Sequence, residues 1–237
     1  MSARTELVNE LIANGNQADA VFLQRFFKTG PGEYGEGDRF LGLRVPQTRA
    51  ITKKYYKELS LNDLDTMLTN KWHEVRFAAL VAMVLQYPKS NEKQRLYDLY
   101  ISHIGRGINN WDLVDVTCPR IVGAYLSNTD KGPLYELVKG DLWQKRVSII
   151  STFYFLSYQQ DPVDTYQLAE ILVTEQHDLL QKAVGWALRE MGKLDGALER
   201  QFLDAHAATM PRTMLRYALE KFSDVERNHY MNLRTQV

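Results

Sequence analysis

Apolar residues recur at intervals of three and four along almost the whole chain, and this spacing constrains the fold more than any other feature. Such spacing places apolar side chains on one face of an α-helix, whereas a half-buried strand would alternate strictly, which no segment does convincingly. Turn-forming residues interrupt the pattern roughly every dozen residues, and Ser60 with Asp63 forms a candidate capping box. The sequence therefore predicts an all-α fold of short helices joined by short loops.

A short internal repeat indicates how these helices are arranged. The segment DLWQKRV at residues 141–147 returns as DLLQKAV at residues 178–184, and KWHEVR at residues 71–76 is a weaker echo. The offset from 141 to 178 is 37 residues, close to the two-helix unit of roughly 40 residues in HEAT and armadillo proteins. We therefore expect a HEAT-like (ARM-type) α-α superhelix whose inner helices line a concave basic groove, formed as a single domain over residues 1–237.

Composition narrows the class of protein. The 237 residues are 45% hydrophobic, enough for one sizeable core. No apolar run approaches the roughly 20 residues of a bilayer span, and the start is unlike a secretory signal. We therefore expect a cytoplasmic protein without membrane contact. We also expect a monomer. The single cysteine, Cys118, has no disulfide or zinc-site partner and is expected to be a buried small residue. Basic and acidic residues balance at 29 each, so a nucleic-acid partner would have to be inferred from local clustering.

One glycine-rich segment, residues 29–38, departs from the helical pattern. It follows a helix and carries three acids, whereas a phosphate-binding loop needs a preceding strand and a Lys-Ser/Thr ending. We interpret it as an ordered turn or short hairpin. The next helix is expected to begin near Pro46 and to carry a small basic cluster of Arg44, Arg49, Lys53 and Lys54.

Several kinds of catalytic site are unsupported by the sequence. The five histidines are scattered without metal-ligand spacing, so we expect no metal and no cofactor, and surface or capping roles suffice for them. No nucleophile or dinucleotide motif occurs, and Cys118 directly precedes Pro119 without a nearby histidine to activate it.

The informative segment is NWDLVD at residues 110–115. Asn109 or Asn110 can cap a helix on which Trp111 and Asp115 share one face at i, i+4, while Asp112 points elsewhere. A purely structural interpretation, a buried tryptophan with first-turn acids that complement the helix dipole, suits Asp112. It suits Asp115 less well, because an apolar run at residues 116–121 continues a helix that should be largely buried.

The repeat adds two further residues. Position 186 aligns with 149, one helical turn after Arg146 on the same face, so Arg146 and Trp186 should lie on the same side of successive inner helices. Each residue has an ordinary alternative role, Trp186 in the core and Arg146 in a surface ion pair. Together with Trp111 and Asp115, they could form one site from three neighbouring repeats.

These three segments, residues 110–115, 143–146 and 181–190, resemble the AlkD family of HEAT-like alkylpurine DNA glycosylases, and the resemblance covers nearly the whole chain. It implies that Trp111, Asp115, Arg146 and Trp186 are the active-site aromatic, carboxylate, arginine and second aromatic. It also implies that basic residues of the concave face hold the DNA backbone, namely Arg44, Arg49, Arg189, Arg212 and Arg216. The loop at residues 30–38 looks longer than in the best-known members, and related subfamilies without excision activity prefer branched DNA.

The resemblance therefore leads us to expect an enzyme that hydrolyses the N-glycosidic bond of cationic alkylated purines, such as 3-methyladenine and 7-methylguanine, in duplex DNA. Two alternatives stay open. One is a module of the same fold that binds damaged or branched DNA without cutting, which the long loop favours. The other is a HEAT-type protein-interaction scaffold, which the zero net charge slightly favours but which has no need of an acid between two tryptophans.

Overall fold

The computed structural model describes residues 2–233, and helices are the main regular secondary structure in this range. Within these residues no strand forms, and the β-type pairing consists of two isolated bridges, Arg39 with Trp72 and Ile104 with Ile108. The predicted all-α, α-α superhelical class is thereby confirmed. Every helix within residues 2–233 is too short or too polar to span a bilayer. The chain divides into two compact units, Met1–Ile121 and Val122–Val237, each of which is described by itself, and the single-domain expectation stays a prediction.

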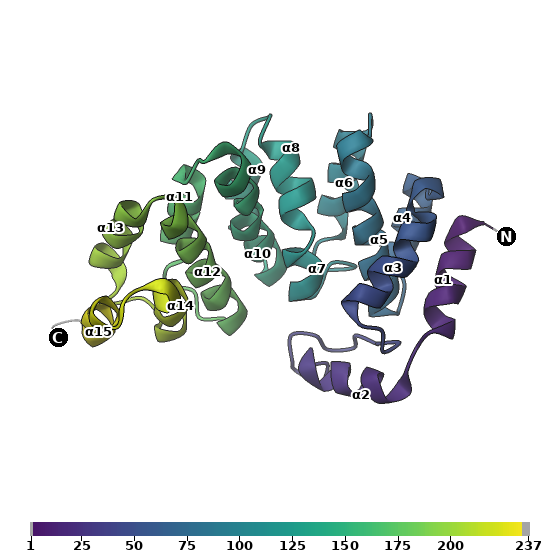
Figure 1. Ribbon diagram of the computed structural model, residues 1–237, viewed down its shortest axis with the longest axis horizontal. Helices are drawn as coiled ribbons and strands as arrows, with labels where there is room; N and C mark the ends of the chain where they lie inside the picture. The colour runs from purple at the N-terminus through teal and green to yellow at the C-terminus, as the bar shows by residue number, and fades with distance from the viewer. Residues whose placement is uncertain (1, 234–237) are drawn as a thin grey trace. The chain divides into compact units, whose positions relative to one another are not determined.

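The described residues of the first unit, 2–121, form seven α-helices and two short 3-10 turns, which Figure 1 labels in part. They are α1 (Ala3–Ala13), α2 (Gln17–Phe26), α3 (Val45–Tyr55), η1 (Tyr56–Glu58), α4 (Leu61–Leu68), α5 (His73–Gln86), η2 (Tyr87–Lys89), α6 (Lys93–His103) and α7 (Trp111–Asp115). The predicted local signals are confirmed: Ser60 and Asp63 form the capping box of α4, Pro46 lies in the first turn of α3, and Asn110 caps α7.

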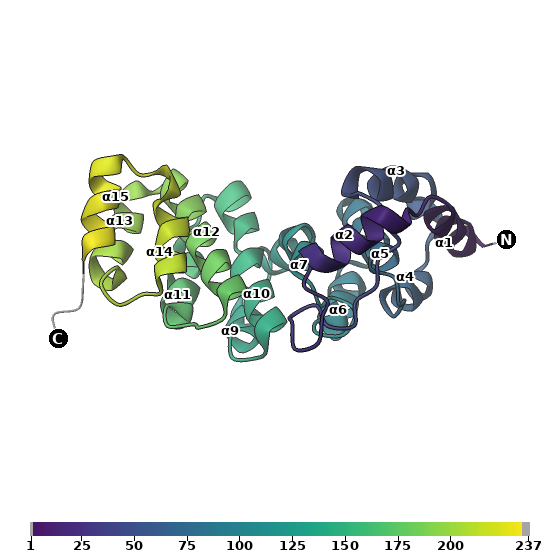
Figure 2. The ribbon, with the colours of Figure 1, turned by 90° about the horizontal axis from the view of Figure 1, so that it is seen from below.

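Helix α5 is the centre of this unit, since residues 73–83 are all buried. It packs against α3, α4, η1 and α7, and α2 crosses below this group (Figures 1 and 2). The buried Glu74 carboxylate accepts backbone N–H bonds from Leu41, Gly42 and Leu43 at 2.8, 2.9 and 3.1 Å. A charged side chain in the first turn of α5 therefore holds the extended segment that leads into α3.

The second unit is built of helix pairs (Figure 1). Its elements are α8 (Ala124–Leu126), α9 (Gly132–Leu137), α10 (Leu142–Ser151), the π-helical η4 (Phe155–Gln159), α11 (Val163–Leu172), α12 (Asp178–Leu194), α13 (Gly196–His206), α14 (Arg212–Ala218), η5 (Leu219–Lys221) and α15 (Asp224–Asn232). Helices α10, α12 and α14 pack in sequence, and the two copies of the repeat begin α10 and α12, as the alignment predicts.

Helices α12 and α14 approach each other closely at Gly185. A Cβ atom there would overlap the carbonyl oxygen of Met214 and lie 2.6 Å from Cβ of Tyr217. Any side chain at position 185 would therefore push the two helices apart.

The segment after α7 corrects one expectation. The apolar run at residues 116–121 was expected to continue a buried helix, but α7 ends at Asp115 and a π-helical turn, Pro119–Gly123, follows. Pro119 explains the break, because it has no backbone N–H and its ring clashes with the carbonyl four residues earlier in a continuous α-helix. Asp115 thus lies at the end of a short helix.

Candidate active site

Helix α7 presents the first pair of predicted site residues. Trp111 is half-buried, and its indole stacks on Phe27 with ring centroids 5.2 Å apart and meets Phe26 edge-on at 6.0 Å. The Asn110 side chain fixes the start of the helix by accepting the N–H of Trp111 at 2.9 Å. Asp115, one turn further along, is also only partly buried. The predicted arrangement of an aromatic and a carboxylate at i, i+4 on one helix is confirmed.

Phenylalanines of α2 and of the segment after it lie around Trp111, and no sequence motif marks them as site residues. Phe22 and Phe26 stack on each other with ring centroids 6.1 Å apart although 60% and 53% of their surface is exposed. Phe27 and Phe40 stack at 5.0 Å inside the unit. An aromatic row therefore leads from the exposed face of α2 to Trp111. The i, i+4 spacing of Phe22 and Phe26 was visible in the sequence, but nothing there indicated that both are exposed.

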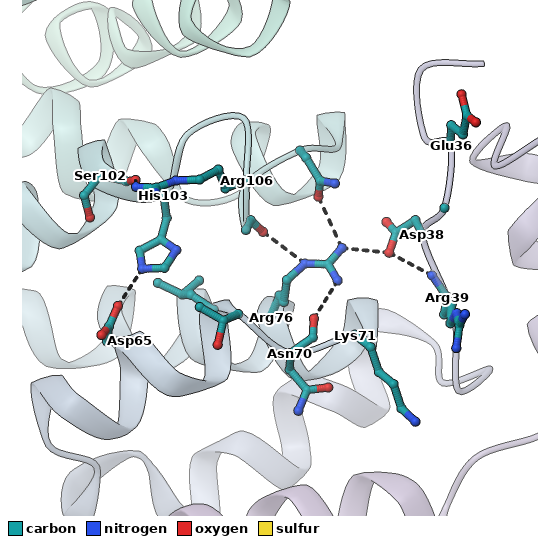
Figure 3. A pocket seen from close by; sticks show the side chains of 15 residues that line it. Glu36, Asp38, Arg39, Asp65, Asn70, Lys71, Arg76, Ser102, His103 and Arg106 are labelled. Carbon is teal, nitrogen blue, oxygen red and sulfur yellow. Dashed lines mark hydrogen bonds and ion pairs between the residues drawn. The ribbon is translucent and has the colours of Figure 1, made fainter. Parts of the chain in front are cut away.

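Four buried residues, Asp38, His73, Arg76 and Asp112, form an ionic cluster next to Trp111. Nδ1 of His73 lies 2.8 Å from Oδ2 of Asp38, and Nε2 lies 2.8 Å from Oδ2 of Asp112. Arg76 donates to Oδ1 of Asp38 at 2.7 Å and also binds the side chain of Asn109 and the backbone carbonyls of Asn70 and Gly107 (Figure 3). The cluster thus joins the glycine-rich loop to α5 and α7.

The interactions within this cluster favour the charged forms of both His73 and Asp38. Burial by itself lowers the pKa of His73, but the charges and hydrogen bonds of Asp112 and Asp38 outweigh it and raise the pKa to about 9. Burial raises the pKa of Asp38, but His73 and Arg76 outweigh it and lower the pKa to about 2. An imidazolium held between two carboxylates is the state that satisfies both ring nitrogens.

Two histidines therefore contradict the expectation of surface or capping roles. His73 is buried in the cluster, and His103 is buried with Nε2 2.7 Å from Oδ1 of Asp65. His177 fits the expectation, since it caps α12 by accepting the N–H of Leu179. No local pattern indicates the roles of His73 and His103, because the partners of His73 lie 35 and 39 residues away and the partner of His103 lies 38 residues away.

The glycine-rich loop is an ordered series of turns, as expected. Glu33 and Glu36 accept the backbone N–H groups of Gly30 and Gly32, both at 2.9 Å, and Gly32 and Gly37 have positive φ. Its last residues line a polar cavity of about 580 Å³, between the segments that precede α5 and α7 (Figure 3). The cavity walls mix cations such as Lys71 and Arg106 with acids such as Glu36.

The second pair of predicted site residues lies in the second unit, on α10 and α12. Arg146 is buried, with 4% of its surface exposed, and its guanidinium donates to the carbonyl of Leu179. Trp186 is half-buried, unlike its neighbours Ala183, Val184 and Ala187 in the core. Its indole Nε1 donates to Glu190 at 3.0 Å, and its ring meets Phe153 edge-on at 4.6 Å. Trp111 with Asp115 and Arg146 with Trp186 thus occupy different units, and their convergence on one site stays a prediction.

The arginines expected to hold DNA have different surroundings. Arg44 is exposed and paired with Asp19 at 3.2 Å, and Arg189 is ion-paired with Glu220. The exposed Arg212 donates to the backbone of Met231, and the exposed Arg216 donates to Thr213 at 3.1 Å. Their contact with DNA stays a prediction.

Arg49 stands out from this set. Its guanidinium lies 5.7 Å from the ring centroid of Phe77, and burial together with the charge of Arg120 lowers its pKa. Neither Arg49 nor Arg120 has a carboxylate ion-pair partner within residues 2–233. A pair of neighbouring cations without an anion favours the binding of a negatively charged group.

Cys118 is buried, as expected. Over the described part of the chain, no group of three or more His, Cys, Asp or Glu residues is arranged to hold a metal ion. The predicted site residues Trp111, Asp115, Arg146 and Trp186 carry one carboxylate, two aromatic faces and one arginine cation.

Comparison with known proteins identifies the family. The family model described as DNA alkylation repair enzyme matches residues 7–222. Among solved structures, a predicted DNA alkylation repair enzyme from Enterococcus faecalis superposes with a TM-score of 0.70 at 15% identity, covering 89% of this chain and 97% of that one, which supports the shared fold. No curated protein matches the chain. Since the family model spans most of the sequence, the chain belongs to the DNA alkylation repair enzyme family.

Proposed function

We propose that the protein is a monofunctional DNA glycosylase that hydrolyses the N-glycosidic bond of cationic alkylated purines, such as 3-methyladenine and 7-methylguanine, in duplex DNA and so initiates base excision repair. The observation that carries the proposal is the pairing of a half-buried indole, Trp111, with a partly exposed carboxylate, Asp115, at the two ends of the short helix α7. Family membership supplies the alkylated DNA substrate.

The proposed reaction needs no general acid. Alkylation at N3 or N7 leaves the purine positively charged, so the base departs neutral without being protonated. One ionised carboxylate is then enough: Asp115 stabilises the oxocarbenium character of the deoxyribose and orients the attacking water. The π-faces of Trp111 and Trp186 attract a cationic sugar or base by about 0.5 to 2 kcal/mol each.

In this proposal the arginines contact phosphates of the DNA backbone, and Arg146 and Arg49 do so in different ways. Arg146 is buried and already bonded to the Leu179 carbonyl, so it acts as a fixed positive charge whose guanidinium edge meets a phosphate beside the lesion. Arg49, with Arg120 near it, gains an anion that balances their mutual repulsion. Arg44, Arg189, Arg212 and Arg216 contribute further phosphate contacts.

The decisive experiment is incubation of the protein with methylated duplex DNA, followed by chromatography of the released bases. Release of 3-methyladenine and 7-methylguanine by the wild type supports the proposal, provided that Asp115→Asn abolishes most of it. Asp98→Asn, which changes an exposed acid on α6, serves as the matched control. The absence of release from any cationic substrate would refute excision.

A second candidate is a module of the same fold that binds damaged or branched DNA without cutting. The observation that favours it is the ordered loop at residues 30–38, whose last residues line a polar cavity. This candidate predicts tight binding of damaged or branched duplexes, with no free base in the same assay.

A further inference from the structure

His73 is connected to α7 by hydrogen bonds and by ring contacts. Its two ring nitrogens each lie 2.8 Å from a carboxylate oxygen, one on Asp38 and one on Asp112. Carboxylates accept hydrogen bonds, so both nitrogens must donate, and only the doubly protonated imidazolium has two donors. The ring is therefore held in one orientation by two charge-assisted bonds.

The bond to Asp112 acts on α7 directly. Asp112 follows Trp111 in the helix and is buried, and its Oδ1 atom has no hydrogen-bond partner within residues 2–233. Within this part of the chain, the hydrogen bond of the Asp112 side chain is the contact of Oδ2 with His73. Without the imidazolium, a buried carboxylate in the first turn of α7 would lack a donor, and the turn would have to move to rehydrate it.

The aromatic contacts of His73 lead to the same helix. The His73 ring stacks on Phe40 at 4.4 Å and lies 5.3 Å from Phe27. Phe27 stacks in turn on the indole of Trp111 at 5.2 Å. His73 thus supports Trp111 twice, through the backbone by Asp112 and through the side chain by Phe27.

We propose that the His73 imidazolium, fixed by Asp38 and Arg76, is a positioning residue that holds Trp111 and the start of α7 in the orientation required for base excision. It touches neither substrate nor reacting atoms. The inference deepens the proposed function and rests on it. Because a displacement of about 1 Å can cost about a hundredfold in rate, loss of His73 affects the chemical step more than the binding of DNA.

The test compares His73→Asn with His103→Asn. His103 is a second buried histidine, and its Nε2 bonds to Asp65 instead of to Asp38 or Asp112. Tryptophans are replaced by 5-fluorotryptophan, and the ¹⁹F resonance of Trp111 is assigned with Trp111→Phe. We expect His73→Asn to shift or broaden this resonance and to leave that of Trp186 unchanged, whereas His103→Asn alters neither.

The second readout separates rate from binding. His73→Asn should slow single-turnover release of 3-methyladenine about ten- to a hundredfold, with the Kd for duplex DNA within about twofold, while His103→Asn keeps the wild-type rate. If His73→Asn does not fold, Asp112→Asn decides, since it leaves the bond from His73 to Asp38 in place. An unmoved Trp111 resonance, or equal rates for the two histidine variants, overturns the proposal. The fluorine signal does not depend on activity, so a wild type that excises nothing refutes the proposed function separately.

Discussion

The carboxylate of Glu74 offers the most direct test of how the first unit is held together. It is 3% exposed and accepts three backbone N–H groups, two at Oε1 from Gly42 and Leu43 and one at Oε2 from Leu41. In Glu74→Gln only one oxygen remains. The best orientation keeps that oxygen at the Oε1 position and turns the new NH₂ group toward the buried N–H of Leu41.

The expected cost follows from these three bonds. Losing a bond to a charged acceptor costs about 1.5 to 3 kcal/mol, and turning the other two into neutral bonds costs about 0.5 to 1 kcal/mol each. These terms sum to about 2.5 to 5 kcal/mol, and relief of the buried charge offsets about 1 kcal/mol of this. We therefore expect a destabilisation of about 1.5 to 4 kcal/mol, a large share of the about 5 to 15 kcal/mol typical of a folded protein.

Urea unfolding at pH 7 measures this difference, with Glu92→Gln as the control. Glu92 pairs with Arg95 at the surface, with 52% of its side chain exposed, and such a pair contributes at most about 1 kcal/mol. Amide hydrogen exchange at residues 41–43 should also accelerate in Glu74→Gln alone. A cost below about 1 kcal/mol, with unchanged protection of these amides, would show that Glu74 does not anchor the segment.

Four further predictions concern the candidate site and the second unit. Asp115→Asn should slow excision about 10² to 10³-fold with little change in DNA affinity, measured by single-turnover base release; loss of folding or equal loss in Asp98→Asn would argue against its role. Arg49→Ala should lower the slope of log K against log salt by about one unit, whereas Arg95→Ala should not, and an unchanged slope would remove Arg49 from the interface. Oligonucleotides with single lesions should lose 3-methyladenine and 7-methylguanine but neither uracil nor hypoxanthine, whose release needs leaving-group protonation; efficient uracil removal would contradict the mechanism. Burial raises the pKa of Glu199 to about 8, so the free energy of unfolding should fall by up to about 1.4 kcal/mol per pH unit between the unfolded pKa near 4.5 and pH 8. Urea midpoints of Glu199→Gln should lack this decline. If the midpoints of wild type and variant change with pH in parallel, the prediction is refuted.

The parts of the fold that could be predicted from the sequence depend on local signals. The start of α7 at Asn110, the capping box of Ser60 and the helical spacing of Trp111 and Asp115 involve residues a few positions apart, where the chemistry of caps and turns decides. The repeat also placed Arg146 and Trp186 on successive packed helices, α10 and α12. Periodicity and capping alone were enough for these features.

The surroundings of the site residues could not be predicted in the same way. His73 and Asp112 were assigned to ordinary exposed or first-turn roles, yet both are buried in one cluster. Nothing in the spacing of a single sequence indicates which acid a histidine meets across the fold. The burial of Arg146 against the Leu179 carbonyl is likewise a tertiary feature, and Pro119 alone marked the early end of α7.

The buried titratable groups change the charge that the folded molecule carries. Counting histidines as neutral gives a formal net charge of zero and an isoelectric point near 7.0. Burial lowers the pKa of His73, but its neighbouring carboxylates outweigh this effect and raise the pKa to about 9. Burial raises the pKa of Glu199 to about 8. Both side chains are therefore mainly protonated at neutral pH. Each adds close to one positive charge, so the native isoelectric point lies above the compositional value, and unfolding lowers it again. Folding itself thus makes a chain of balanced composition more attractive to a polyanion.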